Sequence, residues 1–513
     1  MRKLKVVILK PSKYTKCGQT ERFHQGFMPN PTIQYLASMT PKEVAGYEIE
    51  VVTVDEYVQT DLKYLEHLHE SEDCQTLLAL VGVQSHQLQR AIDLTAYALD
   101  NGVQHCIIGG PHPITVDTTM LQNKGVSFAL SEAELVWLNI LKDAIDGCLC
   151  PIYGEEGRWQ KKLEAPILIP PKKEDLRRYI LPMVGSYPAR GCPFTCNFCS
   201  VIKIAGRRVR SQSIETTMES LRLAKAAGVK MIIFTSDNFN KYEEREELLQ
   251  AMIDEKLNLP FFVQCDTQIV KQEGLVKQLA EAGCFQIYVG VESLTRKTLL
   301  AANKAQNHPE NYKEIVHLCA GYGIKVNFSC IIGFPEDTRE SILENLEELI
   351  LIGPDIASFY ILTPIPGTDQ YDQFMEKGLV TETNLDRFDG TCATWRHPNL
   401  SANELEELLF HCYKKFYSAK HFLKNIWKHG LYSHHRFKLR LHWEMIMPLF
   451  MRWCAFRKTH PLSGGIGRLK LKSDSVSDFA KLRMERFGFE LIPLAQSLKL
   501  SASDLALNAN VRG

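Results

Sequence analysis

Three cysteines in one short loop carry the strongest chemical signal of the sequence. Cys192, Cys196 and Cys199 stand in a CxxxCxxC spacing, with Phe198 directly before the last of them. Thiolates this close in sequence can converge on one metal centre, and a structural zinc site would want a fourth protein ligand at comparable spacing. A four-iron cluster held by three cysteines leaves one iron open. The spacing therefore favours a catalytic cluster, with a zinc site completed by a distant residue and chance clustering as alternatives.

Strands and helices alternate after this loop, which predicts a parallel arrangement that positions it. The expected strands are 231–235, 260–265, 286–291, 325–332 and 356–363. Parallel barrels carry their chemistry at the C-terminal ends of the strands, so polar and glycine-rich turns there are candidate ligand sites. The candidates at or beside these ends are Asp237, Asn238, Gln264, Glu292, Ser293, Gly333 and Pro335.

Residues 1–147 show the same alternation and precede a proline-rich, charged stretch, 148–182, that indicates a linker. The alternation predicts a doubly wound parallel sheet, which binds ligands at the carboxyl ends of its strands. Gly109 and Gly110 follow an apolar run, and Pro111 and His112 come next. The glycines would let the backbone approach a ligand, although a plain tight turn is an alternative. GxGxxG and P-loop motifs are absent, so nucleotide sites of those kinds are not predicted.

The cysteine loop, with Phe198 inside it, resembles the signature of the radical S-adenosylmethionine (SAM) superfamily. The resemblance implies a partial (β/α)6 barrel over residues 183–375 and a [4Fe-4S] cluster on Cys192, Cys196 and Cys199. The open iron would bind the amino and carboxylate groups of SAM. An electron from the cluster would then cleave SAM to methionine and a 5′-deoxyadenosyl radical. The three cysteines are thus expected to be the metal ligands and the catalytic residues.

The resemblance also turns the strand-end residues into expected SAM ligands. The turn at Asp237 departs from the family's frequent Gly-Gly-Glu motif but keeps acceptors for the SAM amino group. Glu292 belongs to a Gly-x-Glu-Ser motif near the ribose and methionine, and Gly333 to a Gly-x-Pro element near adenine. The full expected set is Phe198, Asp237, Asn238, Gln264, Glu292, Ser293, Gly333 and Pro335.

A Rossmann-like domain before such a barrel resembles the cobalamin-binding subfamily. The residues that the resemblance assigns to cobalamin are Gly109, Gly110, Pro111, His112 and Glu132. The DxHxxG motif is absent, and we expect neither His86 nor His112 to ligate cobalt. The layout is similar to that of hopanoid 2-methylases. The expected fold is therefore α/β: a Rossmann-like sheet, a partial (β/α)6 barrel and a mostly helical C-terminal region.

The resemblance implies an enzyme, a cobalamin-dependent radical SAM methyltransferase. It would methylate an unactivated carbon of a small-molecule or lipid-like substrate through methylcobalamin. A non-methylating enzyme similar to the anaerobic cyclase of chlorophyll synthesis is one alternative. A tRNA methylthiotransferase with a second cluster on Cys17, Cys74 and Cys106 is another, although Cys106 lies in an apolar run that favours a core position. A sensor that binds cobalamin or a cluster without turnover is a third.

Composition sets the expected surroundings of the protein. The chain has 513 residues, 60 Lys+Arg against 60 Asp+Glu, and 15 cysteines. A balanced charge does not favour a nucleic-acid partner, and an odd number of sparse cysteines favours a reducing, cytoplasmic setting. The opening residues do not resemble a secretory signal, and no apolar run reaches the roughly 18–20 residues of a spanning helix. A reductant such as flavodoxin or ferredoxin is an expected partner.

The C-terminal region, 376–513, is expected to cap the barrel and to change character after residue 417. Residues 421–460 hold eight Lys/Arg, one acid and interleaved aromatic residues. That composition suits an anionic membrane surface, RNA contact, or a helical accessory domain whose aromatic face packs on the barrel. The sequence thus predicts a cytoplasmic protein that can also contact a membrane peripherally.

Overall fold

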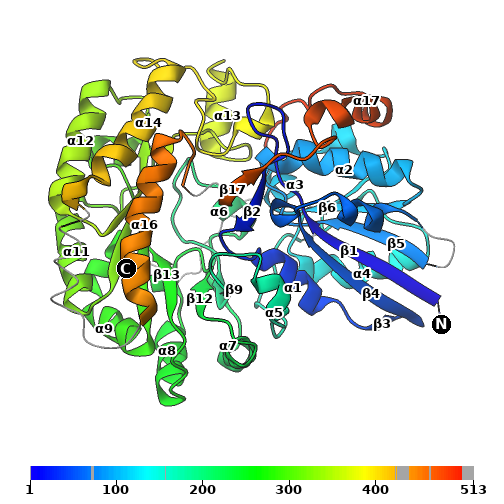
Figure 1. Cartoon of the computed structure of the whole chain (residues 1–513), viewed down its shortest axis with the longest axis horizontal. Coiled ribbons are helices and arrows are strands. Elements are labelled where there is room, and N and C mark those ends of the chain that lie inside the picture. The colour runs from blue at the N-terminus through cyan, green and yellow to red at the C-terminus, as the bar shows by residue number, and fades with distance from the viewer. Residues whose placement is uncertain are drawn as a thin grey trace.

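The computed structural model describes residues 2–70, 74–155, 157–421, 423, 438–461 and 464–499, with backbone alone for 438–446. Two α/β units lie side by side, and the last part of the chain bridges them (Figure 1). Most of the basic-aromatic stretch predicted at 421–460 lies outside the described side chains. Within the described ranges, none of the helices has the length and hydropathy to cross a bilayer.

The N-terminal unit is a seven-stranded sheet in the order β3-β4-β1-β5-β6-β7-β8, parallel except for β3. Its strands are β1 (Arg2–Lys10), β3 (Glu43–Val44), β4 (Tyr47–Asp55), β5 (Cys74–Leu80), β6 (His105–Gly109), β7 (Ser127–Ala129) and β8 (Ile152–Tyr153). Its helices are α1 (Pro31–Met39), α2 (Leu88–Asp100), α3 (Pro111–Thr115) and α4 (Ala133–Ile145). The chain order reverses beside β1, so ligands are expected at the carboxyl ends of β1 and β5.

The apolar run of β1 explains its central place in this sheet. Alternate side chains of a strand point to opposite faces. Val7 and Leu9 pack in one core with α2, whereas Val6 and Ile8 pack in the other core with Trp137 of α4. A strand buried on both faces needs such a continuous apolar sequence, and the predicted doubly wound sheet is confirmed.

The second unit is a six-stranded parallel sheet in the order β16-β15-β14-β13-β12-β9. Its strands are β9 (Met183–Ser186), β12 (Met231–Phe234), β13 (Phe261–Cys265), β14 (Cys284–Glu292), β15 (Lys325–Ile332) and β16 (Ile356–Ile361). The helices between them are α7 (Ile214–Ala226), α8 (Arg245–Asp254), α9 (Glu273–Ala282), α10 (Arg296–Ala301), α11 (Tyr312–Gly321) and α12 (Arg339–Ile352). Strand follows helix in chain order, as the predicted partial barrel requires.

The C-terminal region divides between the two units. α14 (Ala402–Phe416) and α16 (Lys438–Phe456) lie against the second unit, after α13 (Asp369–Glu376). β17 (Gly465–Leu469) then pairs antiparallel with β2 (Arg22–Gly26), and α17 (Val476–Phe487) packs on α2. Figure 1 shows this orange-to-red segment crossing from the barrel to the N-terminal unit. Segments far apart in sequence therefore pack together and join the two units.

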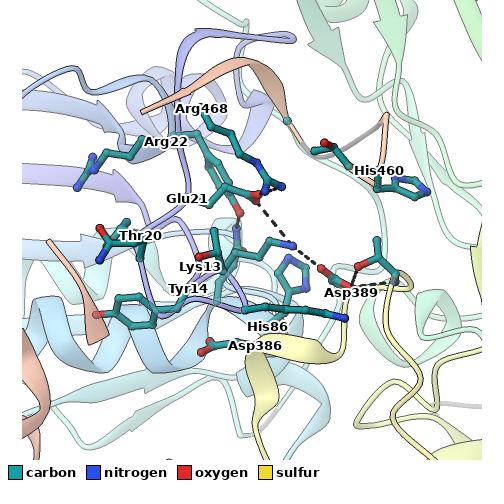
Figure 2. Close-up of a pocket in the computed structure, with 18 of the residues that line it drawn as sticks. Lys13, Tyr14, Thr20, Glu21, Arg22, His86, Asp386, Asp389, His460 and Arg468 are labelled. Atoms are coloured by element: carbon teal, nitrogen blue, oxygen red, sulfur yellow. Dashed lines mark hydrogen bonds and ion pairs between the residues drawn. The ribbon is translucent and has the colours of Figure 1, made fainter. Parts of the chain in front are cut away.

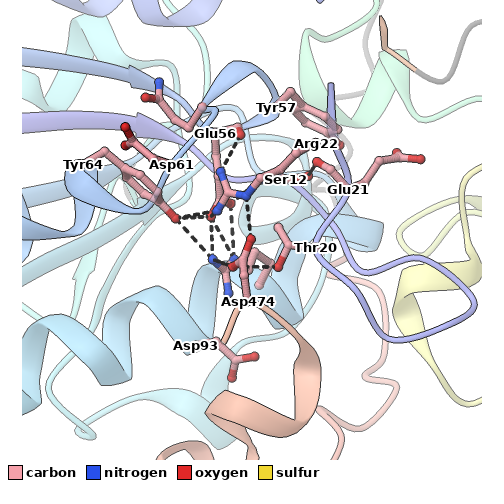
Figure 3. Close-up of polar contacts among 12 residues, drawn as sticks. Ser12, Thr20, Glu21, Arg22, Glu56, Tyr57, Asp61, Tyr64, Asp93 and Asp474 are labelled. Carbon is pink, nitrogen blue, oxygen red and sulfur yellow. Dashed lines mark hydrogen bonds and ion pairs between the residues drawn. The ribbon is translucent and has the colours of Figure 1, made fainter. Parts of the chain in front are cut away.

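A buried ion cluster fixes that crossing segment (Figure 3). Asp474 accepts hydrogen bonds from Arg22 Nε at 2.5 Å and Arg90 Nη2 at 2.9 Å. Glu56 Oε1 lies 3.0 Å from Arg22 Nη2 and 2.6 Å from Arg90 Nη2, and the Tyr64 hydroxyl donates to it at 2.5 Å. Two guanidinium groups thus meet two carboxylates, which compensates charges that would be costly to bury singly. We name these five residues the clasp.

Candidate functional site

The cysteine loop starts at a turn that only glycine fits. It runs from β10 (Ala189–Arg190) to α6 (Val201–Ile204), and β10 pairs with β11 (Arg210–Ser211). Gly191 has φ +106°, and a Cβ there would lie 2.2 Å from the carbonyl oxygen of Arg208. The Gly191 N–H donates to Asp237 Oδ2 at 2.8 Å. The candidate SAM residue Asp237 therefore ties the loop to the end of β12.

The three thiols sit in a poorly solvated environment. Burial raises the pKa of Cys192 to about 11 and that of Cys199 to about 12, and neighbouring thiols add to both shifts. Burial also raises the pKa of Cys196, where Glu292 adds to the shift. Within the described ranges, no three His, Cys, Asp or Glu side chains come close enough to share one metal ion. In a four-iron cluster each thiolate binds its own iron, so its ligands need not meet at a point. Buried thiols that need a metal to ionise fit such a cluster.

A lysine that the sequence analysis missed stands beside these thiols. Lys304 Nζ lies 2.6 Å from Glu292 Oε1 and 5.7 Å from the ring centre of Phe198. Its charge lowers the pKa of both Cys196 and Cys199 against the larger effect of burial. The neighbouring Gln306 Nε2 donates to Cys196 Sγ at 3.6 Å. Lys304 thus neutralises a carboxylate and stabilises thiolates at the same place.

Glu292 ends β14 in a strained backbone conformation. Its φ is +62°, and the pairing of β14 with β15 shifts register between Gly290 and Glu292. Ser329 Oγ of β15 donates to Glu292 Oε2 at 3.3 Å. Asn307 Nδ2 donates to the Gly290 and Val291 carbonyl oxygens, each at 2.9 Å. Strain held by so many neighbours is characteristic of functional sites.

The other SAM candidates differ in how free their polar atoms are. Asn238 Nδ2 donates to Asp266 Oδ2 at 2.8 Å, and Asn238 Oδ1 accepts from the Asp266 N–H at 3.2 Å, so its amide is already engaged. Gln264 lies half-buried near the end of β13, and its amide bonds no other described residue. Ser293 is buried, and its hydroxyl accepts from the Thr295 N–H at 3.1 Å. Gln264 therefore has the freest side chain of the three.

The glycine–proline turn after β15 is fixed by an acid and an aromatic contact. Asp337 Oδ2 accepts from the Gly333 and Phe334 N–H groups at 2.9 and 3.0 Å, and burial raises its pKa to about 6. The rings of Phe334 and Phe198 meet edge to face, 6.2 Å apart. Pro335 follows, half-buried. This turn thereby joins the cysteine loop through Phe198.

A cavity of about 310 Å³ lies between the cysteine loop and the N-terminal unit. Phe198, Ser200 and Ser329 line it from the barrel side, and His86 and Pro111 line it from the other. We name it the inner cavity. It brings the cluster loop against the carboxyl edge of the N-terminal sheet, where both folds place ligands.

A second cavity, of about 330 Å³, lies on the other side of Pro111 at the same sheet edge. Gly109, Gly110 and Glu132 line it, but His112 does not. Gly110 has φ +135°, and a Cβ there would lie 2.2 Å from the Val83 nitrogen, so the close approach requires glycine. Bare backbone and apolar side chains at this edge, with residues of both units in the lining, suit one portion of a bound cofactor.

The polar groups of His112 and Glu132 already have partners within the protein. The His112 ring bonds Ser85 Oγ at 3.0 Å, and burial lowers its pKa to about 3. Glu132 Oε2 lies 2.7 Å from Arg210 Nη1, and Glu132 Oε1 lies 3.3 Å from Arg190 Nη1. Burial opposes the charge on Glu132, but these arginines lower its pKa. Glu132 thus joins the two units beside the cysteine loop.

Comparison with known proteins gives relatives over most of the chain. Residues 186–349 match the Radical SAM superfamily. An uncharacterized methyltransferase of Pyrococcus horikoshii is 26% identical, covering 63% of this chain and 74% of that protein. Bacteriochlorophyllide d C-8(2)-methyltransferase of Chlorobaculum tepidum is 25% identical, covering 67% and 78%. Hopanoid C-2 methylase of Rhodopseudomonas palustris is 25% identical, covering 43% and 44%.

Solved structures share the two-unit fold. The radical S-adenosylmethionine methyltransferase TsrM from Kitasatospora setae, with tryptophan and a SAM analogue bound, superposes with a TM-score of 0.59 at 16% identity, covering 74% of this chain and 78% of that chain. The cobalamin-dependent SAM radical enzyme OxsB, with aqua-cobalamin and SAM bound, gives 0.57 at 15%, covering 94% and 80%. At these identities the likeness is one of fold.

Proposed function

We propose that this chain, whose residues 186–349 form a radical SAM domain, is a cobalamin-dependent radical SAM methyltransferase. Its substrate would be a small molecule that offers an unactivated carbon. One observation carries the proposal: the cysteine loop and the carboxyl edge of the N-terminal sheet line the same inner cavity. The curated relatives named as methyltransferases support it.

The residues at this junction divide among three cofactors. Cys192, Cys196 and Cys199 would hold the [4Fe-4S] cluster, and the ends of β12 to β15 would hold SAM. The bare backbone at Gly109 and Gly110 would cradle cobalamin. When bound, the cluster and SAM supply a 5′-deoxyadenosyl radical and cobalamin carries the methyl group.

The chain itself positions and shields this chemistry. Lys304 holds Glu292 in place and offsets negative charge at the thiols. The edge-to-face contact of Phe198 with Phe334 places apolar surface between the cysteine loop and the turn after β15. Arg190 and Arg210 hold the N-terminal unit through Glu132, which keeps the two cofactor sites at a fixed separation. Exclusion of water protects reactive intermediates from side reactions.

Product analysis separates methyl transfer from the cyclase-like alternative. Anaerobically reconstituted protein would be incubated with cobalamin, SAM and reduced flavodoxin, and both SAM products would be quantified. Methyl transfer predicts S-adenosylhomocysteine together with 5′-deoxyadenosine. Formation of 5′-deoxyadenosine alone, in the presence of a turned-over substrate, would favour non-methylating chemistry.

The methylthiotransferase and sensor alternatives make different predictions. Cys17 is exposed, Cys74 is half-buried and Cys106 is buried in β6, and these thiols form no metal-binding group within the described ranges. Iron near four atoms per chain would contradict a second cluster. A sensor would bind SAM and leave it intact.

Peripheral membrane contact is a further part of the proposal, and the outer face of α16 supports it. Met447, Met451 and Cys454 face inward, whereas Leu449, Trp453 and Phe456 are about half exposed. The guanidinium of Arg457 lies 5.5 Å from the Trp453 ring centre, and that of Arg452 lies 5.1 Å from the Phe456 ring centre. Exposed aromatic residues flanked by cations suit an anionic bilayer surface.

Vesicle sedimentation tests this contact. The protein is expected to sediment with phosphatidylglycerol vesicles and not with phosphatidylcholine vesicles, and Trp453→Glu should abolish the binding. The matched control is Leu351→Glu, at an exposed leucine of α12. Equal sedimentation of Trp453→Glu and Leu351→Glu would contradict the contact.

A further inference from the structure

A cavity of about 1120 Å³ adjoins the inner cavity and has no role in the proposed function (Figure 2). Most of its wall comes from residues 10–31, 386–410, 458–460 and 464–470, and residues in 55–58 and 84–87 together with Tyr179 and Tyr360 complete it. Gln84, His86, Tyr360 and Asp389 line both cavities. The larger space, which we name the outer chamber, therefore leads to the place where the cysteine loop faces the N-terminal unit.

The wall that β17 contributes is held rigidly. Arg468 pairs in register with Phe23 of β2, and the clasp fixes Asp474 a few residues later. Glu21 and Arg22 belong to the segment that carries β2, so one side of the chamber is built from strand pairing and buried ion pairs. The backbone of such a wall needs no rearrangement when a ligand binds.

In two ion pairs on the chamber wall, the basic side chain is more exposed than its acidic partner. Arg468 Nη2 lies 2.9 Å from Glu21 Oε1, yet the Arg468 side chain is 48% exposed and that of Glu21 only 2%. Lys16 and Glu406 form a pair at 2.7 Å in which the lysine is again the more exposed partner, 56% against 30%. A ligand that enters the chamber therefore meets the cation of each pair.

Two further lysines add to this cationic face. Lys458 and Lys470 are exposed on the chamber wall and form no ion pair with any other described residue. Glu407 is the exposed acid among the charged residues that line the chamber. Cations outnumber acids on the accessible part of the wall, which favours an anionic ligand.

The inner end of the chamber differs from its mouth, because its lysine is flanked by carboxylates. Lys13 lies between Glu21 and Asp389, with its Nζ 3.8 Å from Glu21 Oε2 and in direct contact with Asp389 Oδ2. Figure 2 shows this row of side chains, with the His86 ring directly beneath it. One lysine faces two carboxylates here, so the chamber runs from a cationic mouth to an inner end without excess positive charge beside the inner cavity.

We infer that the outer chamber binds a substrate bearing an anionic group, a carboxylate or a phosphate, through Arg468 together with Lys458 and Lys470. The remainder of that molecule extends past His86 and Tyr360, so that its reacting carbon enters the inner cavity. The anion site stands on the chamber alone, whereas the placement of the reacting carbon rests on the proposed function. An uncharged polycyclic lipid would leave this cationic wall without a partner.

Calorimetric titration of the reconstituted holoprotein with inorganic pyrophosphate and, separately, with citrate tests the anion site. Wild-type protein should bind at least one of them saturably at constant ionic strength, and the preferred anion distinguishes phosphate from carboxylate. Arg468→Gln should weaken that binding about tenfold or more, as expected for loss of one charge-assisted contact. The matched control is Arg486→Gln, because Arg486 is a comparably exposed arginine of the same segment with one acidic partner, Asp100.

A second pair of variants guards against misfolding at β17. Lys458→Gln should weaken the same anion several-fold, whereas Lys481→Gln, at an exposed lysine outside the chamber, should bind like wild type. Absence of saturable binding by either anion, or equal affinities for each variant and its control, would overturn the inference. Binding needs no turnover, so a protein that binds pyrophosphate or citrate but never cleaves SAM would refute the proposed function and leave the anion site standing.

Discussion

Two buried ion clusters of this protein use the same chemistry for different ends. In the clasp, Arg22, Arg90 and Glu56 have side chains that are 0% exposed, and each charge is met by another. Beside the cysteine loop, Lys304 forms an ion pair with Glu292, whose backbone is strained. The charge of Lys304 also acts on the nearby thiols. A closed set of charges holds distant segments together, whereas an open set next to a cavity can respond to a bound group.

The clasp should give the largest effect on stability. Asp474→Ala leaves Arg22 and Arg90 short of a carboxylate in a buried place and should lower the free energy of unfolding by about 3–5 kcal/mol. Urea denaturation measures the loss. Asp478→Ala is the control on the same segment, because Asp478 only caps α17 and should cost about 1 kcal/mol. Similar losses for the two variants would contradict the role of the clasp.

Lys304→Met should lower SAM cleavage about a hundredfold, or about 2.7 kcal/mol in activation free energy. The reason is that Glu292 would lose its cationic partner beside the cluster ligands. Rates of 5′-deoxyadenosine formation, normalised to bound iron, measure this effect.

A double variant separates catalysis from folding at this pair. Glu292→Gln with Lys304→Met removes both charges and should restore the stability that Lys304→Met loses, without restoring SAM cleavage. Recovery of the rate together with the stability would mean that the pair, like the clasp, only holds the fold.

The pH dependence of stability that we expect from Asp337 is opposite in sign to that of an ion-paired carboxylate. Burial raises the pKa of the Asp337 carboxyl in the folded protein to about 6, above its ordinary value of 3.8. The folded protein therefore binds this proton more tightly than the unfolded chain does. Stability should therefore fall by about 2 kcal/mol as the pH rises from about 4 to about 6. Asp337→Asn should remove this decline in thermal unfolding followed across that range. A wild-type profile that is retained in the variant would show that another group is responsible.

The smallest effect is expected at His112. Its ring bonds Ser85 and lines neither the inner cavity nor the cavity beside Gly110. His112→Gln should change cobalamin affinity less than twofold in spectrophotometric titration. Gly110→Ala should weaken that affinity strongly, because the new Cβ would collide with the backbone of Val83. A large loss with His112→Gln would restore the role that the sequence resemblance gave this residue.

The cysteine loop and the strand-end turns could be predicted because their signals are local. CxxxCxxC spacing fixes three thiols in one loop, and alternating strands and helices fix which turns share an edge. Lys304 could not be found in this way, since a single lysine in a loop after α10 is typical of a solvated surface. The polar run Asn303–Asn307 that follows a short helix was the available signal.

The clasp and the outer chamber depend on contacts that sequence periodicity does not encode. Arg22 and Asp474 stand more than 400 residues apart along the chain, and an isolated arginine normally indicates exposure. β2 and β17 are short strands with glycines, so their pairing has no strong pattern of its own. Only the assembled fold reveals that residues 464–499 belong with the N-terminal unit.

Cleavage of SAM by Cys196→Ala, compared with Cys412→Ala, tests the central claim most directly. Both cysteines are buried, but Cys412 lies on α14 outside the cysteine loop. After anaerobic reconstitution and reduction, we expect wild-type 5′-deoxyadenosine formation by Cys412→Ala and none by Cys196→Ala. Undiminished 5′-deoxyadenosine formation by Cys196→Ala would contradict the assignment of the cluster, and with it the proposed function.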